Sequence, residues 1–205
     1  MGNRRGILWD RLDHPGLFNF LRHLIDGGQV APLREVLRRH GVRSVLDIGC
    51  GTGDFCPVAD GGYLGIDGNP RFIACAARRF PGPERRFAVM DIRAMDFGAE
   101  RFDAAIIVNT IHHLADAEAA SAIAAAGRFA RLVVIHDWLP PEGNPLRLLL
   151  ARLDRGAHPR GIKAQKALIE RAGLRVLDTT TFWSSSRLYH HSIIVAEKEE
   201  ACSKQ

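Results

Sequence analysis

Three glycines spaced two residues apart follow an apolar run and an acid in the stretch Val45–Phe55, which reads VLDIGCGTGDF. Glycines at the end of a strand let backbone N–H groups approach a bound ligand, and a helix that starts there adds its dipole. Such a turn can hold a nicotinamide dinucleotide, a nucleoside triphosphate or a smaller molecule. The residues around the glycines discriminate among these three ligands.

The spacing of the glycines departs from both phosphate-binding patterns. The dinucleotide fingerprint Gly-x-Gly-x-x-Gly has its last glycine three positions after the second. Gly49 and Gly51 fit this pattern, but the third position holds Asp54, and Gly53 comes one residue too early. No Gly-Lys-Ser/Thr sequence, which a triphosphate loop requires, follows the turn. A phosphate would meet a carboxylate here, so the sequence disfavours both nucleotide ligands.

Two acids flank the glycines and predict a negative rim for the pocket. Asp47 stands at the end of the strand and Asp54 follows the glycines, where it is expected to cap a helix rather than to bind a ligand. A negative rim favours a cation without phosphates. S-adenosylmethionine carries a sulfonium and an ammonium group, so it fits this prediction.

Four segments resemble, in order, the motifs of class I S-adenosylmethionine-dependent methyltransferases. DIGCGTG at Asp47–Gly53 resembles the first motif, and the later motifs are matched by Gly65–Pro70, Val89–Ile92 and Phe102–Leu114. The resemblance is strong over about residues 43–138 and loose elsewhere. It implies S-adenosylmethionine as the cofactor and S-adenosylhomocysteine as the product.

The resemblance also implies roles for individual residues. The acid of the second motif, Asp67, would accept hydrogen bonds from both ribose hydroxyls, and the acid of the third, Asp91, from the adenine amino group. Ile92 would pack on the adenine ring. The predicted cofactor-binding residues are Asp47, Gly49, Cys50, Gly51, Gly53, Asp67, Gly68, Asn69, Asp91, Ile92 and Asn109.

Two adjacent histidines in the fourth motif, His112 and His113, are the candidates for a catalytic base. The pKa of an imidazole lies near neutral pH, so an imidazole beside the sulfonium can take the proton of an attacking hydroxyl. The sequence is equally compatible with a structural role. The family resemblance implies that His-His-Leu occurs at this place in enzymes that act on varied substrates.

Four more residues are candidates for the substrate pocket: His136, Trp138, Arg155 and Tyr189. Trp138 can stack on a substrate ring or pack in the core. Arg155 lies in a polar loop, interpreted as a solvated connection in preference to an anion-binding cover. The histidines lack metal-ligand spacing, so no metal site is predicted.

Other residues of these segments also invite alternative interpretations. Asp137 can orient an imidazole or simply pack beside it. Tyr189 precedes His190 and His191 in a strand pattern, whose alternation turns only one of the two histidines inward.

Five short apolar runs alternate with helical segments in the central part of the chain. They suit strands covered on both faces of a parallel sheet with right-handed crossovers, and they span residues 44–48, 63–66, 87–90, 102–108 and 132–135. Two further strands, expected at 174–181 and 188–197, would form an antiparallel pair at the edge. The predicted fold class is α/β, a Rossmann-like seven-stranded mostly parallel sheet with helices on both faces and an antiparallel last strand.

Helical spacing divides the chain into an N-terminal helical cap at 1–40, a cofactor-binding domain at 41–198 and a flexible tail at 199–205. The cap is expected to hold two amphipathic helices separated by Gly27–Gly28. It is interpreted as a lid over the carboxyl edge of the sheet, with a membrane-surface role or a dimer contact as alternatives. Further helices are expected at 116–130, 146–153 and 162–172.

Two connections depart from the family pattern. The short segment between Gly53 and Tyr63 predicts a first crossover helix of only two turns. The usual Pro-Gly-Gly turn before the fifth strand is replaced by Gly127–Arg131. The second departure leaves the connection between helix and strand open, but neither affects the cofactor site.

Bulk properties exclude several functional classes. The net charge of +5 comes without a concentrated basic tract, which disfavours nucleic-acid binding. The longest apolar runs are strand-length, so neither a membrane span nor a secretory signal is predicted. The four cysteines lack metal-finger spacing and are interpreted as reduced thiols. We therefore expect a cytoplasmic protein, monomeric or homodimeric.

The sequence thus predicts methyl transfer to an oxygen or nitrogen of a small-molecule metabolite by in-line displacement. The fourth motif lacks the Asn/Asp-Pro-Pro-Tyr/Phe of enzymes that methylate base amino groups and the Pro-Cys of cytosine carbon-5 enzymes. A non-catalytic cofactor-binding module and an RNA-modifying methyltransferase remain alternatives, and a dehydrogenase is the weakest.

Overall fold

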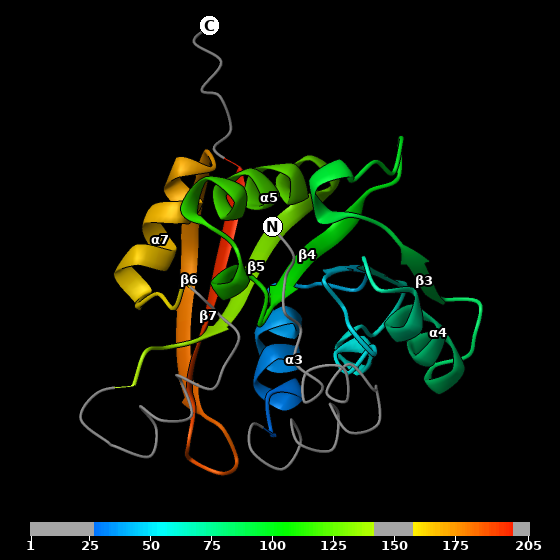
Figure 1. Ribbon diagram of the computed structural model, residues 1–205, viewed down its shortest axis with the longest axis horizontal. Helices are drawn as coiled ribbons and strands as arrows, with labels where there is room; N and C mark the ends of the chain where they lie inside the picture. Colours follow the sequence, from blue (N-terminus) through cyan, green and yellow to red (C-terminus); the bar gives the residue numbers. More distant parts are fainter. Residues whose placement is uncertain (1–26, 142–157, 199–205) are drawn as a thin grey trace, which may run out of the picture.

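The computed structural model describes residues 27–141 and 158–198. In these ranges seven strands form one sheet: β1 (Val45–Ile48), β2 (Tyr63–Asp67), β3 (Arg85–Val89), β4 (Phe102–Val108), β5 (Ala130–Trp138), β6 (Leu174–Trp183) and β7 (His190–Lys198). Their order is β3-β2-β1-β4-β5-β7-β6 (Figure 1). The first five strands pair in parallel, and β7 runs antiparallel to both β5 and β6. This confirms the predicted fold class.

The central strands are apolar because helices cover both of their faces. One core cluster joins the sheet to α5 (Asp116–Phe129) and α7 (Ile162–Arg171). A second cluster joins the opposite face to α3 (Val30–Arg39) and to the 3₁₀ turn η1 (Cys56–Val58). The remaining helix, α4 (Pro70–Arg79), connects β2 to β3 and starts at an Asn69 cap followed by proline.

Strand β5 is longer than its apolar run indicates. The run predicted only 132–135, but β5 extends to Trp138, because Asp137 pairs with Ser192 of β7 and Trp138 with His191. His136, Asp137 and Trp138 therefore belong to the strand and do not follow it. Pairing between strands distant in sequence fixes this boundary, and local composition does not reveal it.

Two predicted connections take a different form. The first crossover contains the three-residue turn η1 instead of a two-turn helix, because only nine residues separate Gly53 from Tyr63 and Pro57 lies inside the turn. Helix α5 passes directly into β5 without a separate turn. Gly127 allows this close passage, since a Cβ there would lie 3.2 Å from Leu174 Cδ2.

Of the predicted N-terminal cap, α3 is present, and it packs on a face of the sheet through Leu33, Val36 and Leu37. The first predicted helix of the cap, the helix at 146–153 and the tail lie outside the described residues. No helix in the described ranges combines the length and the apolar character needed to cross a membrane.

The structure predicts that stability depends on the middle of β4. Ile106 is fully buried, whereas Val89 on the edge strand β3 is 55% exposed. We expect Ile106→Ala to lower the free energy of unfolding by about 2–5 kcal/mol because it leaves a cavity. Val89→Ala should change it by less than about 0.5 kcal/mol. Urea unfolding followed by circular dichroism measures both values, and equal effects would contradict the placement of this core.

Candidate functional site

The three glycines after β1 form a turn with left-handed backbone conformations. The φ angles of Gly49, Gly51 and Gly53 are 80°, 54° and 79°. The turn is fastened to β2, because the amides of Gly49 and Cys50 donate to the carbonyl of Ile66 at 2.8 and 2.9 Å. A Cβ at Gly49 would lie 2.8 Å from Thr110 Oγ1, whereas a Cβ at Gly51 would meet nothing within 4 Å. Gly51 therefore presents open backbone to a ligand.

Asp67, the last residue of β2, lies beside this turn. Its Oδ2 accepts from the Gly51 amide at 3.0 Å, and its Oδ1 accepts from the Asn69 amide at 2.7 Å. A carboxylate has about four acceptor positions, so two remain for the vicinal hydroxyls of a ribose. Gly68 is exposed at the same edge, and the side chain of Asn69 caps α4 by accepting from Arg71 N.

The third predicted motif lies next along the sheet edge, immediately after β3. Asp91 accepts from the backbone amide of Arg93 at 2.9 Å and from its guanidinium at 3.1 and 2.9 Å. These hydrogen bonds lower the pKa of the Asp91 carboxyl. Ile92 begins the turn η2 (Ile92–Ala94) and packs partly against the core. Both residues are accessible at the edge where Asp67 lies.

The two acids predicted to form a negative rim are instead buried. Asp47 is 1% exposed inside β1 and accepts a hydrogen bond from the Tyr63 hydroxyl. Asp54 is 8% exposed and forms an ion pair with Arg79, so it does not cap a helix. Arg79 also donates to the carbonyl of Thr52 at 2.8 Å. These acids therefore support the turn from inside the protein, and the accessible acids of this edge are the partly buried Asp67 and the exposed Asp91.

Cys50 is directed toward the sheet. Its Sγ lies 2.8 Å from the position that a Cβ at Gly65 would occupy, and the residue is 6% exposed. Burial raises the pKa of the Cys50 thiol far above its usual range and that of Cys56 to about 11. Cys50 contributes backbone to the turn, and its thiol is a packing group.

Asn109 follows β4 with a φ of 48°. Its amide donates to the carbonyl of His136 at 2.8 Å, and its side-chain nitrogen donates to Gln29 Oε1 at 3.0 Å. In the described part of the chain its buried Oδ1 has no hydrogen-bond partner. An acceptor left unpaired at the carboxyl edge of the sheet suits a ligand that donates a hydrogen bond.

The structure separates the two candidate bases, which lie in η3 (Ile111–His113). His112 is 4% exposed, and its Nδ1 lies 2.6 Å from Asp137 Oδ1, while its amide donates to Asp137 Oδ2 at 3.1 Å. In a neutral ring this contact requires the proton on Nδ1, which leaves Nε2 as the nitrogen that can accept a proton. His113 is exposed, with its ring centroid 4.1 Å from that of His112.

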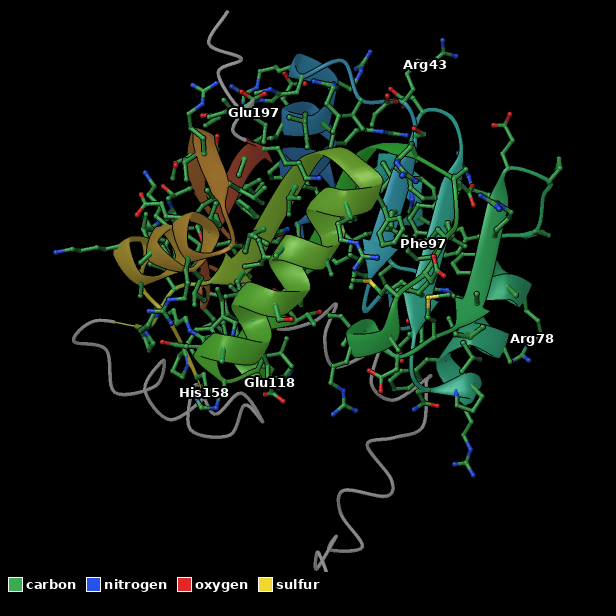
Figure 2. The ribbon with its side chains drawn as sticks, turned by 90° about the horizontal axis from the view of Figure 1, so that it is seen from above. Arg43, Arg78, Phe97, Glu118, His158 and Glu197 are labelled. Atoms are coloured by element: carbon green, nitrogen blue, oxygen red, sulfur yellow. The ribbon has the colours of Figure 1, made fainter. Side chains whose placement is uncertain are left out.

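A buried arginine that the sequence did not identify holds this turn in place. Arg160 is 7% exposed and donates at 2.7 Å to the carbonyls of Ile111 and Leu114 and at 2.8 Å to Asp116 Oδ1. The amide of His158 donates to the carbonyl of His112 at 2.9 Å. Figure 2 labels His158 and Glu118, which lie on this segment and on α5. His158 and Arg160, in the loop that was predicted to be solvated, therefore act as a clamp on the turn that carries His112. Arg155 of the same loop lies outside the described residues.

A cavity of about 690 Å³ lies where β5 ends and β6 turns into β7, and two of the predicted pocket residues, Trp138 and Tyr189, are among its lining residues. His136 does not line it, which corrects the expectation of a substrate contact. It is fully buried, with its ring 5.8 Å from Phe55 and 5.5 Å from Phe182.

The remaining predicted features of this region follow from strand alternation. His191 is buried and His190 partly exposed, so only one of the pair points inward, as expected. Among the described residues, no group of three or more His, Cys, Asp or Glu side chains is arranged to hold a metal ion.

Comparison with known proteins finds methyltransferases that are similar to this chain. Residues 45–131, from β1 into β5, match the family model described as a methyltransferase domain. The chain is also 29% identical over 147 residues to O-methyltransferase cnsE of Penicillium expansum, covering 66% of this chain and 53% of that protein. The chain thus spans about half the length of the curated relative that it matches.

Solved structures share the fold at low identity. Magnesium protoporphyrin IX methyltransferase of Synechocystis PCC 6803 with bound SAH has a TM-score of 0.69 and 19% identity, covering 94% of this chain and 99% of that one. The putative methyltransferase in complex with the Trm112 activator of Haloferax volcanii has a TM-score of 0.74 and 14% identity, covering 93% and 97%. These likenesses show the fold, and the match to the methyltransferase domain model agrees with the resemblance stated from the motifs.

A matched pair of glycine variants tests whether a ligand approaches Gly51. Gly41, after α3, also has a positive φ of 68° and nothing within 4 Å of an added Cβ, but it lies outside the turn. We expect Gly51→Ala to weaken S-adenosylhomocysteine binding at least tenfold in calorimetric titration, because its methyl group occupies the ligand's place. Gly41→Ala carries similar backbone strain and should bind normally. Equal affinities would show that the ligand does not approach Gly51.

Thiol reactivity tests the burial of the turn. Because the pKa values of Cys50 and Cys56 are raised, almost none of either thiol is ionised at pH 8, and the thiolate is the reactive form. Cys75 on α4 is partly exposed. Among the three described cysteines, maleimide labelling read by peptide mass spectrometry should modify Cys75 first and Cys50 and Cys56 only after unfolding. Early labelling of Cys50 would contradict its packing against Gly65.

Proposed function

We propose that this chain, which resembles the class I S-adenosylmethionine-dependent methyltransferases, methylates a hydroxyl oxygen of a small molecule, with His112 as the general base. The observation that carries this proposal is the buried pair of His112 and Asp137, with 2.6 Å between Nδ1 and Oδ1. A buried, carboxylate-oriented imidazole is the arrangement that removes a proton from a hydroxyl during attack.

The described residues fit the cofactor. Gly51 offers open backbone, Asp67 has acceptor positions for two ribose hydroxyls, and Asp91 with Ile92 stands next along the edge for the adenine. When bound, S-adenosylmethionine supplies an electrophilic methyl carbon, and the electron pair of its broken C–S bond stays on sulfur as a neutral thioether. Asp91 would then divide its acceptor positions between Arg93 and the adenine amino group.

The chain's own residues account for the proton. As an oxygen lone pair forms the new O–CH₃ bond, the hydroxyl proton passes to Nε2 of His112. Asp137 then faces an imidazolium and compensates its positive charge, which lowers the barrier in a buried site. The clamp by Arg160 and the amide of His158 keep the ring in position for this transfer.

Two observations favour an oxygen acceptor over the alternatives. A neutral amine attacks through its lone pair before it loses a proton, so it does not need an oriented base, whereas a hydroxyl does. The relative from Penicillium expansum is named an O-methyltransferase, which supports the same choice. A cofactor-binding module without catalysis would have no use for a buried His–Asp pair, so catalysis is favoured over that alternative.

The base is tested by His112→Gln, with His113→Gln as the matched control on the exposed neighbour. Release of S-adenosylhomocysteine is measured with 2-naphthol as the hydroxyl acceptor and tryptamine as the amine. We expect His112→Gln to lower kcat with 2-naphthol by about 10²–10⁴-fold at pH 7, with normal S-adenosylhomocysteine binding. The defect should shrink as the pH rises, because the naphthol then ionises without help. His113→Gln should stay within about threefold of the parent.

Three results would contradict this assignment. Unchanged turnover in His112→Gln would remove the residue from the reaction, and a defect constant with pH would assign it a structural role. Preferential methylation of tryptamine would transfer the proposal from oxygen to nitrogen acceptors.

A further inference from the structure

We propose that the cavity at the end of β5 binds a planar aromatic acceptor, with the indole N–H of Trp138 donating a hydrogen bond to an oxygen of that ligand. This inference rests on the proposed function, because it names the substrate class of the same site. The proposed ligand is a neutral, flat molecule that contains a ring and carries the hydroxyl to be methylated.

The size and chemistry of the cavity favour such a ligand. Its volume of about 690 Å³ lies within the range of small-molecule sites. The walls are formed by aromatic and aliphatic side chains, including Trp138, Trp183, Tyr189 and Leu188, and by Pro140. No Asp, Glu, Lys or Arg lines it among the described residues. The described part of this lining is therefore better suited to a neutral ligand than to a phosphate ester or a nucleic acid.

The aromatic rings that line the cavity differ in their orientation relative to one another. The rings of Trp138 and Tyr189 stand nearly perpendicular, at 82°, with centroids 6.2 Å apart. Trp183 and His190 stack at 4.4 Å and 14°, and Trp183 is 42% exposed. Such surfaces bind flat rings by stacking and edge contacts in addition to apolar burial. A ligand over Trp183 would also remove a large apolar surface from water.

Trp138 supplies the polar point of recognition. The residue is 3% exposed, and its Nε1 is buried without a hydrogen-bond partner in the described part of the chain. Buried N–H donors in folded proteins are nearly always paired. Trp138 lines the cavity, and we assign an acceptor atom of a ligand bound there as the partner of this N–H.

The same wall adjoins the proposed base. Trp138 follows Asp137 directly in β5, and its ring lies 5.8 Å from that of His112 in an edge-on arrangement. Asp137 binds both neighbours, since it accepts from the Trp138 amide at 2.9 Å and pairs with the His112 ring. A ring held against Trp138 therefore brings its substituents into the neighbourhood of His112.

The ligand class is tested by calorimetric titration of the full chain in the presence of S-adenosylhomocysteine. The probes are 2-naphthol, its saturated counterpart decahydro-2-naphthol, and 1-hydroxyanthraquinone, which adds carbonyl acceptors to a flat ring system. We expect 2-naphthol to bind at least tenfold more tightly than decahydro-2-naphthol. 1-Hydroxyanthraquinone should bind more tightly still.

Two variants test the location. Trp138→Phe keeps an aromatic ring but removes the N–H. It should weaken the binding of 1-hydroxyanthraquinone at least fivefold. Gly161→Leu fills the cavity without strain, since Gly161 has φ −68° and ψ 167° and nothing within 4 Å of an added Cβ. It should abolish binding of both aromatic probes while leaving the melting temperature near that of the parent. The control is Leu177→Ala, an exposed position near the start of β6 and outside the cavity lining, which should bind like the parent.

Equal affinity for the saturated and aromatic alcohols, or unchanged binding in Gly161→Leu, would overturn the inference. These outcomes are separate from a failure of the proposed function. If S-adenosylhomocysteine binds and another acceptor is methylated while 2-naphthol does not bind, only the ligand class is wrong. If the aromatic probes bind through Trp138 but no hydroxyl is methylated, the cavity assignment stands and the oxygen transfer fails.

Discussion

The candidate site depends on one buried carboxylate, that of Asp137, which is 1% exposed. A charge in this position must be compensated by hydrogen bonds, because burial removes its hydration. Asp137 accepts from the ring and the amide of His112 and from the amide of Trp138. The base and the aromatic wall of the cavity are therefore attached to the same group, and neither can move without breaking one of its hydrogen bonds.

The network continues from Asp137 into the covering helix. The hydroxyl of Ser192 on β7 donates to Gln165 Oε1 at 2.7 Å and lies 3.3 Å from the Asp137 carbonyl. Gln165 donates to the carbonyl of Arg160 at 2.8 Å, and Arg160 holds the turn that carries His112. The antiparallel strand β7 and helix α7 thus take part in positioning a residue that follows β4.

Local patterns in the sequence were sufficient for the parts of the fold that depend on neighbouring residues. The bounds of β4 agree with its apolar run at 102–108, and the glycines and Asp67 lie at one edge because parallel strands end there together. The role of Arg160 could not be predicted from the sequence, because the carbonyls that accept its hydrogen bonds lie 46 and 49 residues away along the chain. His136 was misassigned because residues of β5 alternate between the core and the site, and the register comes from β7.

The reversed direction of β7 separates the two edges of the sheet. Leu132, near the start of β5, pairs with Glu197, so β7 ends at the edge opposite the glycine turn and the cavity. Figure 2 shows Glu197 and His158 at opposite ends of the molecule. Attachment to a sensor surface or a resin through the C-terminal side of Lys198 would therefore orient the site toward bulk solution. Gly27 lies on the other side, because its carbonyl accepts from the amide of Ser185 in the hairpin beside the cavity.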